Sequence, residues 1–142
     1  MPKPVATWRL YVMRLVFLLN FVLLGSDVWP EILRHQGVWD PVKGVAFSFW
    51  AALSLLSGLG LRYPLKMVPL LLLQLVYKTI WLLAVALPMW PALRSTDITR
   101  AMVIGVVVDV LGIPWSYILA SYVKERGDRW RQQTKEPVQF RS

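Results

Sequence analysis

Four apolar segments alternate with short polar stretches along the 142-residue chain. Each segment is close to the roughly 20 residues that an α-helix needs to cross the hydrocarbon core of a bilayer. The segments lie at about 9–28, 42–61, 67–88 and 98–123. The second contains the uncharged run GVAFSFWAALSLLSGLGL (44–61), whereas the others include ionisable or amide side chains. This pattern predicts an all-α, four-span antiparallel transmembrane bundle within residues 1–131 and a polar cytoplasmic tail at 132–142.

The boundaries of these segments carry their own signals. Asp40 followed by Pro41 is typical of an N-cap with proline in the first helical turn, so it predicts the start of the second helix. Pro64 predicts a turn of only a few residues before the third helix. In DVWPEILRHQG (27–37) the apolar residues recur on one helical face, which predicts a short helix on the membrane surface. They are Val28, Trp29, Ile32 and Leu33.

Composition narrows the classes of function. Hydrophobic residues make up 56% of the chain and charged residues 17%, a balance more apolar than that of ordinary soluble proteins. The chain has no cysteine and a single histidine, so disulfides, thiolate metal sites and histidine clusters are excluded. No phosphate-binding loop or nucleophile–base set is recognisable. We therefore expect a non-enzymatic protein without a cofactor.

The net charge of +8 is distributed unevenly. If both termini are cytoplasmic, the inner side holds eleven basic residues and the outer loops only four, which fits the positive-inside rule and makes nucleic-acid binding unnecessary as an explanation. The tail after the fourth segment is either a solvated end or a contact with anionic lipid headgroups. The residues for such a contact are Lys124, Arg126, Arg129 and Arg131, with Trp130 at the interface.

Lys78 interrupts an apolar stretch, QLVYKTIWLL (74–83), in which a bare ammonium is costly. Counted from the outer ends at about 1.5 Å per residue, Lys78 lies about 15 Å down the third segment and Asp109 about 17 Å down the fourth. Both residues are then near the middle of a core about 30 Å thick. Because these two helices should be neighbours, we expect a buried Lys78–Asp109 ion pair.

Other polar and small residues fit an intramembrane polar centre. Gln74 lies one turn before Lys78 on the same face, and Asn20 is near mid-depth in the first segment with Asp27 two turns later. Two stripes of small or polar residues would let helices approach closely. One is Gly105, Asp109, Gly112 and Ser116, and the other is Ser48, Ala51, Ser54 and Gly58.

Pro114 lies inside the predicted fourth helix and should kink it about one turn beyond Asp109. An acid beside a carbonyl freed by proline is a plausible ion or proton site, although proline kinks are also common in purely structural membrane helices. Two interpretations therefore stay open, a structural ion pair and a direct role in transport or ligand binding. Trp50, Trp81 and Trp115 either line a ligand cavity or provide bulky packing.

Two stretches resemble a known kind of protein. LRYPLKMVPLLLLQLVYKTIWLLAVALP (61–88) and IPWSYILASYVKERGDRWR (113–131) resemble short, uncharacterised bacterial four-span inner-membrane proteins. The architecture is similar to that of DoxX-like membrane proteins in length and number of spans. The resemblance implies a bacterial plasma membrane and four helices, and it implies no activity.

Together these observations predict a multi-pass protein of the bacterial inner membrane with cytoplasmic termini. We expect it to be an accessory subunit or to bind a lipid or other hydrophobic small molecule within the bundle. The alternative is a small oligomeric proton-coupled transporter with Asp109 as coupling acid and Lys78 as counter-ion. The expected partners are the bilayer and either a membrane protein or further copies of the chain, without nucleic acid.

Overall fold

The computed structural model describes residues 4–127, and all of its regular elements within that range are helical. Three continuous helices are long and apolar enough to cross a membrane, namely Thr7–Arg34, Pro41–Arg62 and Val68–Ala86. A fourth candidate exists only if Asp97–Gly112 and Trp115–Lys124 are counted as one interrupted span. The chain is thus an all-helical protein with three or four candidate spans, as is compatible with a membrane protein.

Several of these helices combine α-helical and π-helical turns. The first comprises α1 (Thr7–Leu19), the π-helical segment η1 (Asn20–Leu24) and α2 (Gly25–Arg34). The second is α3 (Pro41–Arg62), and the third comprises α4 (Val68–Trp81) and the π-helical η2 (Leu82–Ala86). The remaining elements are α5 (Trp90–Leu93), α6 (Asp97–Gly112), α7 (Trp115–Ile118) and the π-helical η3 (Leu119–Lys124).

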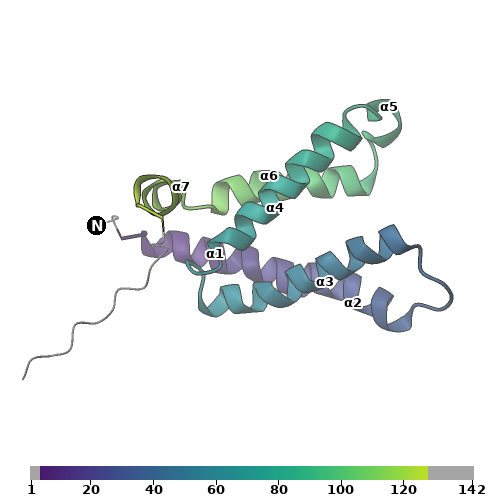
Figure 1. Ribbon diagram of the computed structural model, residues 1–142, viewed down its shortest axis with the longest axis horizontal. Coiled ribbons are helices and arrows are strands. Elements are labelled where there is room, and N and C mark those ends of the chain that lie inside the picture. The colour runs from purple at the N-terminus through teal and green to yellow at the C-terminus, as the bar shows by residue number, and fades with distance from the viewer. Residues whose placement is uncertain (1–3, 128–142) are drawn as a thin grey trace, which may run out of the picture. The chain divides into compact units, whose positions relative to one another are not determined.

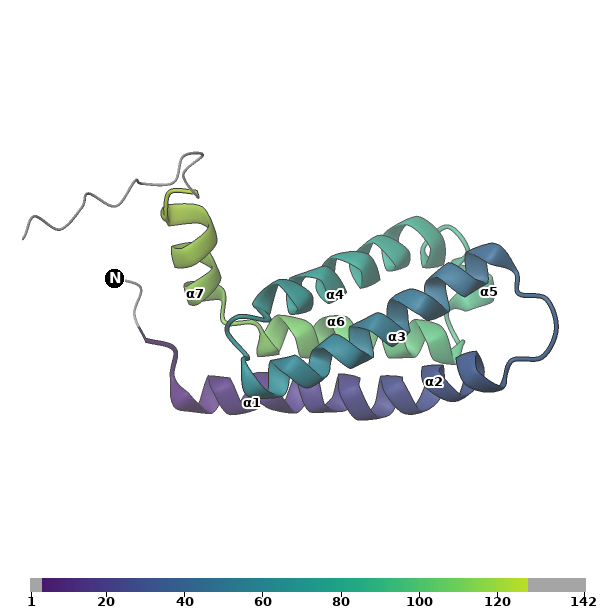
Figure 2. The ribbon, with the colours of Figure 1, turned by 60° about the horizontal axis from the view of Figure 1, so that its bottom comes forward.

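The described residues divide into two compact units. One is Pro4–Pro114, and the other includes residues 115–127 with α7 and η3. Within Pro4–Pro114, α1, η1 and α2 pack along α3, and α4 packs along α6, as Figures 1 and 2 show. A smaller contact joins α1 to α6. The candidate site described below belongs entirely to this larger unit.

The pair formed by the first helix and α3 is closely packed through small residues. Phe17 is fully buried and lies directly over Gly60, where a Cβ atom would overlap the aromatic ring. Phe21 lies over Gly58, where an added Cβ would stand 3.1 Å from the ring. Ser54 accepts a hydrogen bond from the indole Nε1 of Trp29 at 3.0 Å. The seam therefore depends on shape complementarity, with aromatic rings filling the space over glycines.

The predicted boundary of α3 is confirmed, whereas the segment predicted as a separate short helix before it is part of the first helix. Asp40 caps α3 by accepting a hydrogen bond from the Lys43 backbone N–H at 2.8 Å, and Pro41 opens the helix. The first helix, however, continues without a break to Arg34. Its apolar face is used against α3, because Val28 is buried and Trp29 bonds to Ser54. That packing keeps the segment helical despite Pro30, which cannot donate a backbone hydrogen bond.

The predicted continuous fourth helix, 98–123, also differs from the structure. The helix ends at Gly112, because Ile113 is extended with φ −69° and ψ 126°. A residue that precedes proline disfavours the α conformation, so Pro114 ends α6 here and does not merely kink a helix that continues. The Ile113 N–H still bonds to the Asp109 carbonyl at 2.9 Å. Residues from Trp115 onward belong to the other unit.

The predicted tail, 132–142, lies outside the described residues. The same holds for Arg129, Trp130 and Arg131 of the predicted headgroup contact. Lys124 and Arg126 are described, and both are exposed.

Candidate functional site

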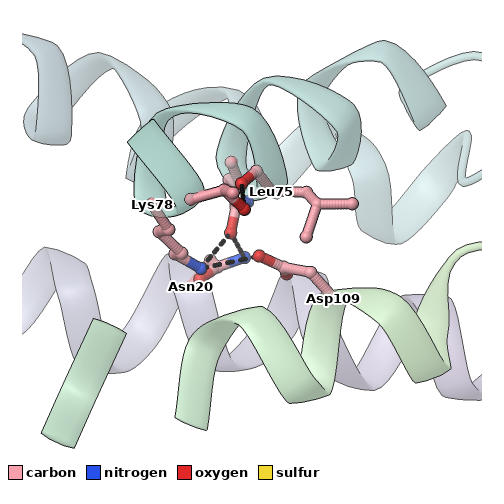
Figure 3. Close-up of polar contacts among 6 residues, drawn as sticks. Asn20, Leu75, Lys78 and Asp109 are labelled. Carbon is pink, nitrogen blue, oxygen red and sulfur yellow. Dashed lines mark hydrogen bonds and ion pairs between the residues drawn. The ribbon is translucent and has the colours of Figure 1, made fainter. Parts of the chain in front are cut away.

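The Lys78 and Asp109 side chains meet inside the larger unit. Lys78 comes from α4 and Asp109 from α6, and the Lys78 Nζ donates to Asp109 Oδ2 at 2.8 Å. Figure 3 shows the two side chains pointing toward each other between the helices. Asp109 is 1% exposed and Lys78 is 9% exposed. The structure therefore contains the ion pair that the depth argument predicted.

Gln74 connects this ion pair to the first helix. Its Oε1 accepts one hydrogen bond from Lys78 Nζ at 3.1 Å and another from Asn20 Nδ2 at 3.1 Å. Gln74 reaches Lys78 because the two residues are four apart on α4, and Asn20 begins η1 on the first helix. The cluster of Asn20, Gln74, Lys78 and Asp109, called the polar centre from here on, therefore joins three separate helices. Asn20, Lys78 and Asp109 are labelled in Figure 3.

Gly105 provides the space in which the lysine lies. It precedes Asp109 by one turn on α6, and a Cβ atom at this position would stand 2.8 Å from Lys78 Nζ and 3.0 Å from its Cε. The lysine side chain thus crosses directly over the α6 backbone on its way to the carboxylate. The predicted small-residue stripe contained Gly105 as a helix-packing position, and the structure shows that it accommodates a charged side chain instead.

The charges of the polar centre cancel. An uncompensated ammonium or carboxylate in a low-dielectric interior costs several kcal/mol, and a close partner with extra hydrogen bonds offsets most of that cost. Lys78 has both, since it donates to a carboxylate and to an amide oxygen. Among residues 4–127, the Gln74 Nε2 is one of two buried side-chain atoms without a hydrogen-bond partner. The polar centre is therefore neutral and retains one unused donor.

Two open clefts adjoin the polar centre, and a third adjoins one of these two. The Asp109 cleft has a volume of about 330 Å³ and is lined by Asn20, Asp27, Lys78, Gly105 and Asp109, together with apolar residues of the first helix and α6. The Trp50 cleft, about 280 Å³, shares Asn20, Asp27 and Lys78 with it and adds Trp50, Tyr77 and Met102. The Trp81 cleft, about 560 Å³, shares Trp50, Tyr77, Ile98 and Met102 with the Trp50 cleft and is otherwise lined by Val42, Val45, Ala46, Phe49 and Trp81.

The clefts change in character from one to the next. The Asp109 and Trp50 clefts are each lined in part by charged and amide side chains, whereas the Trp81 cleft has an almost wholly apolar lining. A concave surface of this kind, apolar with a few polar groups at one end, is the usual form of a small-molecule site. The arrangement can hold an apolar body beside a polar or charged group, and Asn20 and Lys78 of the polar centre line the two more polar clefts.

Asp27 stands out among the lining residues. It lies on α2, two turns beyond Asn20, and lines both the Asp109 cleft and the Trp50 cleft. Its side chain is exposed, and no lysine, arginine or histidine of residues 4–127 forms an ion pair with it. The sequence placed Asp27 on the same face as Asn20, and the structure adds that this face borders the clefts.

The remaining predicted site residues lie elsewhere. Ser116 was expected to extend the stripe of Gly105, Asp109 and Gly112, but the helix ends at Gly112 and Ser116 is an exposed residue of the other unit. Pro114 is buried and ends α6, as described above. Of the deep tryptophans, Trp50 and Trp81 line clefts, whereas Trp115 also belongs to the other unit.

Two arginine contacts were not predicted. Arg14 Nε donates to the Leu61 carbonyl at the end of α3 at 3.1 Å, and Arg9 Nη1 donates to the Ile113 carbonyl just after α6 at 3.3 Å. The last carbonyls of a helix lack intrahelical partners and lie at the negative end of its dipole, so a guanidinium satisfies both needs. The only signal in the sequence was that basic residues stand at matching ends of the segments.

In the described part of the chain, no group of three or more His, Asp or Glu side chains gathers that could bind a metal ion.

The comparisons with known proteins give no further guide, because no family model, no curated protein and no solved structure matches the chain. Conclusions on function therefore depend on the geometry of the polar centre and the clefts.

Proposed function

We propose that the chain is a multi-pass protein of the bacterial inner membrane that binds a lipid or other hydrophobic small molecule between its helices and catalyses no reaction. The Trp81 cleft, with its large volume and apolar lining, is the observation that carries this proposal. A membrane setting is supported by the large apolar side chains that are exposed along the candidate spans, such as Leu15, Leu55, Leu83 and Ile104. In water such surfaces would drive association.

The proposed topology is a four-span antiparallel bundle with both termini in the cytoplasm. Under the positive-inside rule, the basic residues at the Arg9 and Arg62 ends favour that side. The interrupted pair Asp97–Gly112 and Trp115–Lys124 would supply the fourth crossing. The first helix, with 28 residues, measures about 42 Å, so its last turns would stand in the outer headgroup region.

In this proposal the polar centre holds the helices that line the clefts in fixed positions. The ion pair fixes α4 against α6, and the Gln74–Asn20 hydrogen bond fixes α4 against the first helix. Helices that were held only by apolar contacts would slide more easily in lipid, because lipid chains offer similar contacts. The hydrogen-bonded register therefore holds Tyr77 and Trp81 of α4 beside the space that the ligand occupies.

The test is lipid binding to the full-length protein, measured by native mass spectrometry after addition of a diacylglycerol, a neutral lipid. We expect one lipid per chain, and we expect Ala46→Phe to lower the affinity about tenfold because the new ring fills the Trp81 cleft. Ala52→Phe is the matched control, since Ala52 is exposed on the same helix and lines none of the three clefts. Equal binding by the parent protein and both variants would refute the proposed site.

One observation favours a second candidate, proton-coupled transport. The Asp109 cleft borders both Lys78 and Asp109, so the ion pair lies at the edge of an open space. Loss or gain of a proton by either partner would leave the other charge unpaired, which could couple protonation to a rearrangement. Transport predicts that proteoliposomes under a pH gradient accumulate ethidium and that folded Asp109→Asn protein does not. Equal uptake by the parent protein and this variant would exclude Asp109 as the coupling acid.

A further inference from the structure

The charges that line the Asp109 and Trp50 clefts do not sum to zero. Their ionisable groups with a charge at neutral pH are Asp27, Lys78 and Asp109. Lys78 and Asp109 neutralise each other at 2.8 Å, and Gln74 Oε1 accepts a second hydrogen bond from the ammonium. Asp27 has no cationic partner among residues 4–127. The lining therefore carries one excess negative charge, located at Asp27.

A negative charge beside apolar walls is unfavourable unless a cation or water compensates it. A monovalent cation in either cleft would bring the lining to neutrality, whereas an anion would add a second negative charge next to Asp27. Lys78 would attract an anion only weakly, because Asp109 already neutralises its charge. Charge thus favours a cationic ligand over an anionic or neutral one.

The side chains that line the clefts favour an organic cation over a metal ion. Small hard ions such as Ca²⁺ need six to eight oxygen ligands, and no group of three or more His, Asp or Glu residues gathers within residues 4–127. The Trp50 cleft instead places Asp27 in the same lining as Trp50 and Tyr77. Aromatic faces attract organic cations, and a nearby carboxylate strengthens that attraction.

The Trp81 cleft provides for the rest of such a molecule. It shares Trp50, Tyr77, Ile98 and Met102 with the Trp50 cleft, so the two spaces adjoin along these four residues. Its remaining lining is apolar and includes Phe49, which stacks edge-on against Tyr77 with ring centroids 5.3 Å apart. An apolar body could lie here while a charged group stays beside Asp27.

We propose that the ligand of these clefts is an organic monocation with an apolar body. Its positive group binds Asp27 between Trp50 and Tyr77, and its apolar part occupies the Trp81 cleft. This inference rests on the proposed binding function and specifies the class of ligand. Lys78 and Asp109 form a neutral pair, so Asp27 is the charge that selects the ligand.

The test uses two probes of nearly equal size and shape and opposite charge, tetraphenylphosphonium and tetraphenylborate. Their affinities for the full-length protein in detergent are measured by equilibrium dialysis. We expect the cation to bind at least about tenfold more tightly than the anion, and we expect Asp27→Asn to bring the ratio close to one. Asp27→Glu, which keeps the charge, should retain the preference.

Three further variants show which residues cause the preference. Asp97→Asn removes the same charge from an exposed residue that lines none of the three clefts, so the ratio should not change. Trp50→Phe should retain most of the cation affinity, and Trp50→Leu should lose severalfold because the aromatic face is gone. If Asp97→Asn lowers the ratio as much as Asp27→Asn, the preference comes from general surface charge and the inference is overturned.

The results separate this inference from the binding function itself. If diacylglycerol binding is sensitive to Ala46→Phe but the parent protein binds both ions equally, the cationic ligand is refuted and the binding function stands. If neither diacylglycerol nor either ion binds, both fall. If Asp27→Asn protein is not recovered as a monodisperse species, the ratio in the parent protein decides, and a value of one or less overturns the inference.

Discussion

The two helix pairs of the larger unit are held together in contrasting ways. The first helix and α3 meet through an apolar seam, in which the rings of Phe17 and Phe21 lie over Gly60 and Gly58. The helices α4 and α6 meet through a polar seam, in which Lys78 crosses over Gly105 to reach Asp109. Glycine serves both seams, but it makes room for a ring in one and for an ammonium in the other. Substitutions should therefore break the two seams by different mechanisms.

The largest expected effect is at the polar seam. Asp109→Leu leaves the Lys78 ammonium buried without its carboxylate, so we expect the free energy of unfolding to fall by about 3–5 kcal/mol. Lys78→Met should cost a similar amount. The double variant Lys78→Met/Asp109→Leu should recover most of the loss, because no uncompensated charge remains. Unfolding in mixtures of mild detergent and dodecyl sulfate measures all four proteins. Additive losses in the double variant would show that the two side chains do not act as a pair.

A single added methyl group should be enough to destabilise the apolar seam. Gly60→Ala places a methyl group inside the Phe17 ring, which is fully buried and cannot move away freely. We expect a loss of about 2–3 kcal/mol in the same unfolding assay, typical of an overpacked core. Gly44→Ala is the control, since the nearest atom to its added Cβ is 4.0 Å away and alanine favours the helix. Rescue of Gly60→Ala by Phe17→Leu would identify the ring as the cause, and failure to rescue would count against it.

Gly105→Ala tests whether the polar seam also depends on space. The added methyl group would stand too close to Lys78 Nζ, so the ammonium must shift away from Asp109. The end of a lysine is flexible, and we therefore expect a smaller loss of about 1–2 kcal/mol. In the Lys78→Met/Asp109→Leu background the same substitution should cost less, because no ion pair holds the side chain in place. An equal cost in both backgrounds would assign the effect to the helix backbone.

The smallest effect is expected at Gln74. Gln74→Leu removes the acceptor of Asn20 Nδ2 and one of the two acceptors of Lys78, but it also removes the buried Nε2 that has no partner within residues 4–127. These opposing changes should leave a net loss of about 1 kcal/mol. Asn20→Leu and the double variant complete a thermodynamic cycle. A coupling energy of zero would mean that the Asn20–Gln74 hydrogen bond does not help to join the first helix to α4.

Periodicity and depth arithmetic predicted the polar seam from the sequence, because a charge in an apolar segment has few ways to be compensated. That constraint predicts that Lys78 pairs with Asp109 of a neighbouring helix, even when the packing of the helices is unknown. It also placed Gln74 and Asn20 nearby, since both are amides at a similar depth. All four side chains belong to the hydrogen-bonded cluster of the structure.

The apolar seam and the helix ends were harder to predict from the sequence. Which glycine lies under which ring depends on the rotation of one helix against another, and many rotations give the same hydrophobic pattern. The continuation of the first helix through Pro30 depends on tertiary contacts of Val28 and Trp29, which local sequence signals do not contain. The end of α6 was misjudged because a proline can kink a membrane helix or end it, and the extended conformation of Ile113 decides for the latter.

The arginines of the first helix bear on the order in which the protein is assembled. Arg14 and Arg9 donate to carbonyls that lie 47 and 104 residues further along the chain. During synthesis both guanidinium groups leave the ribosome long before their acceptors, so the two donors are present before α3 is complete and before α6 is made. The helices α3 and α6 can then dock against the first helix one after the other, with Arg14 and Arg9 binding their carboxyl ends.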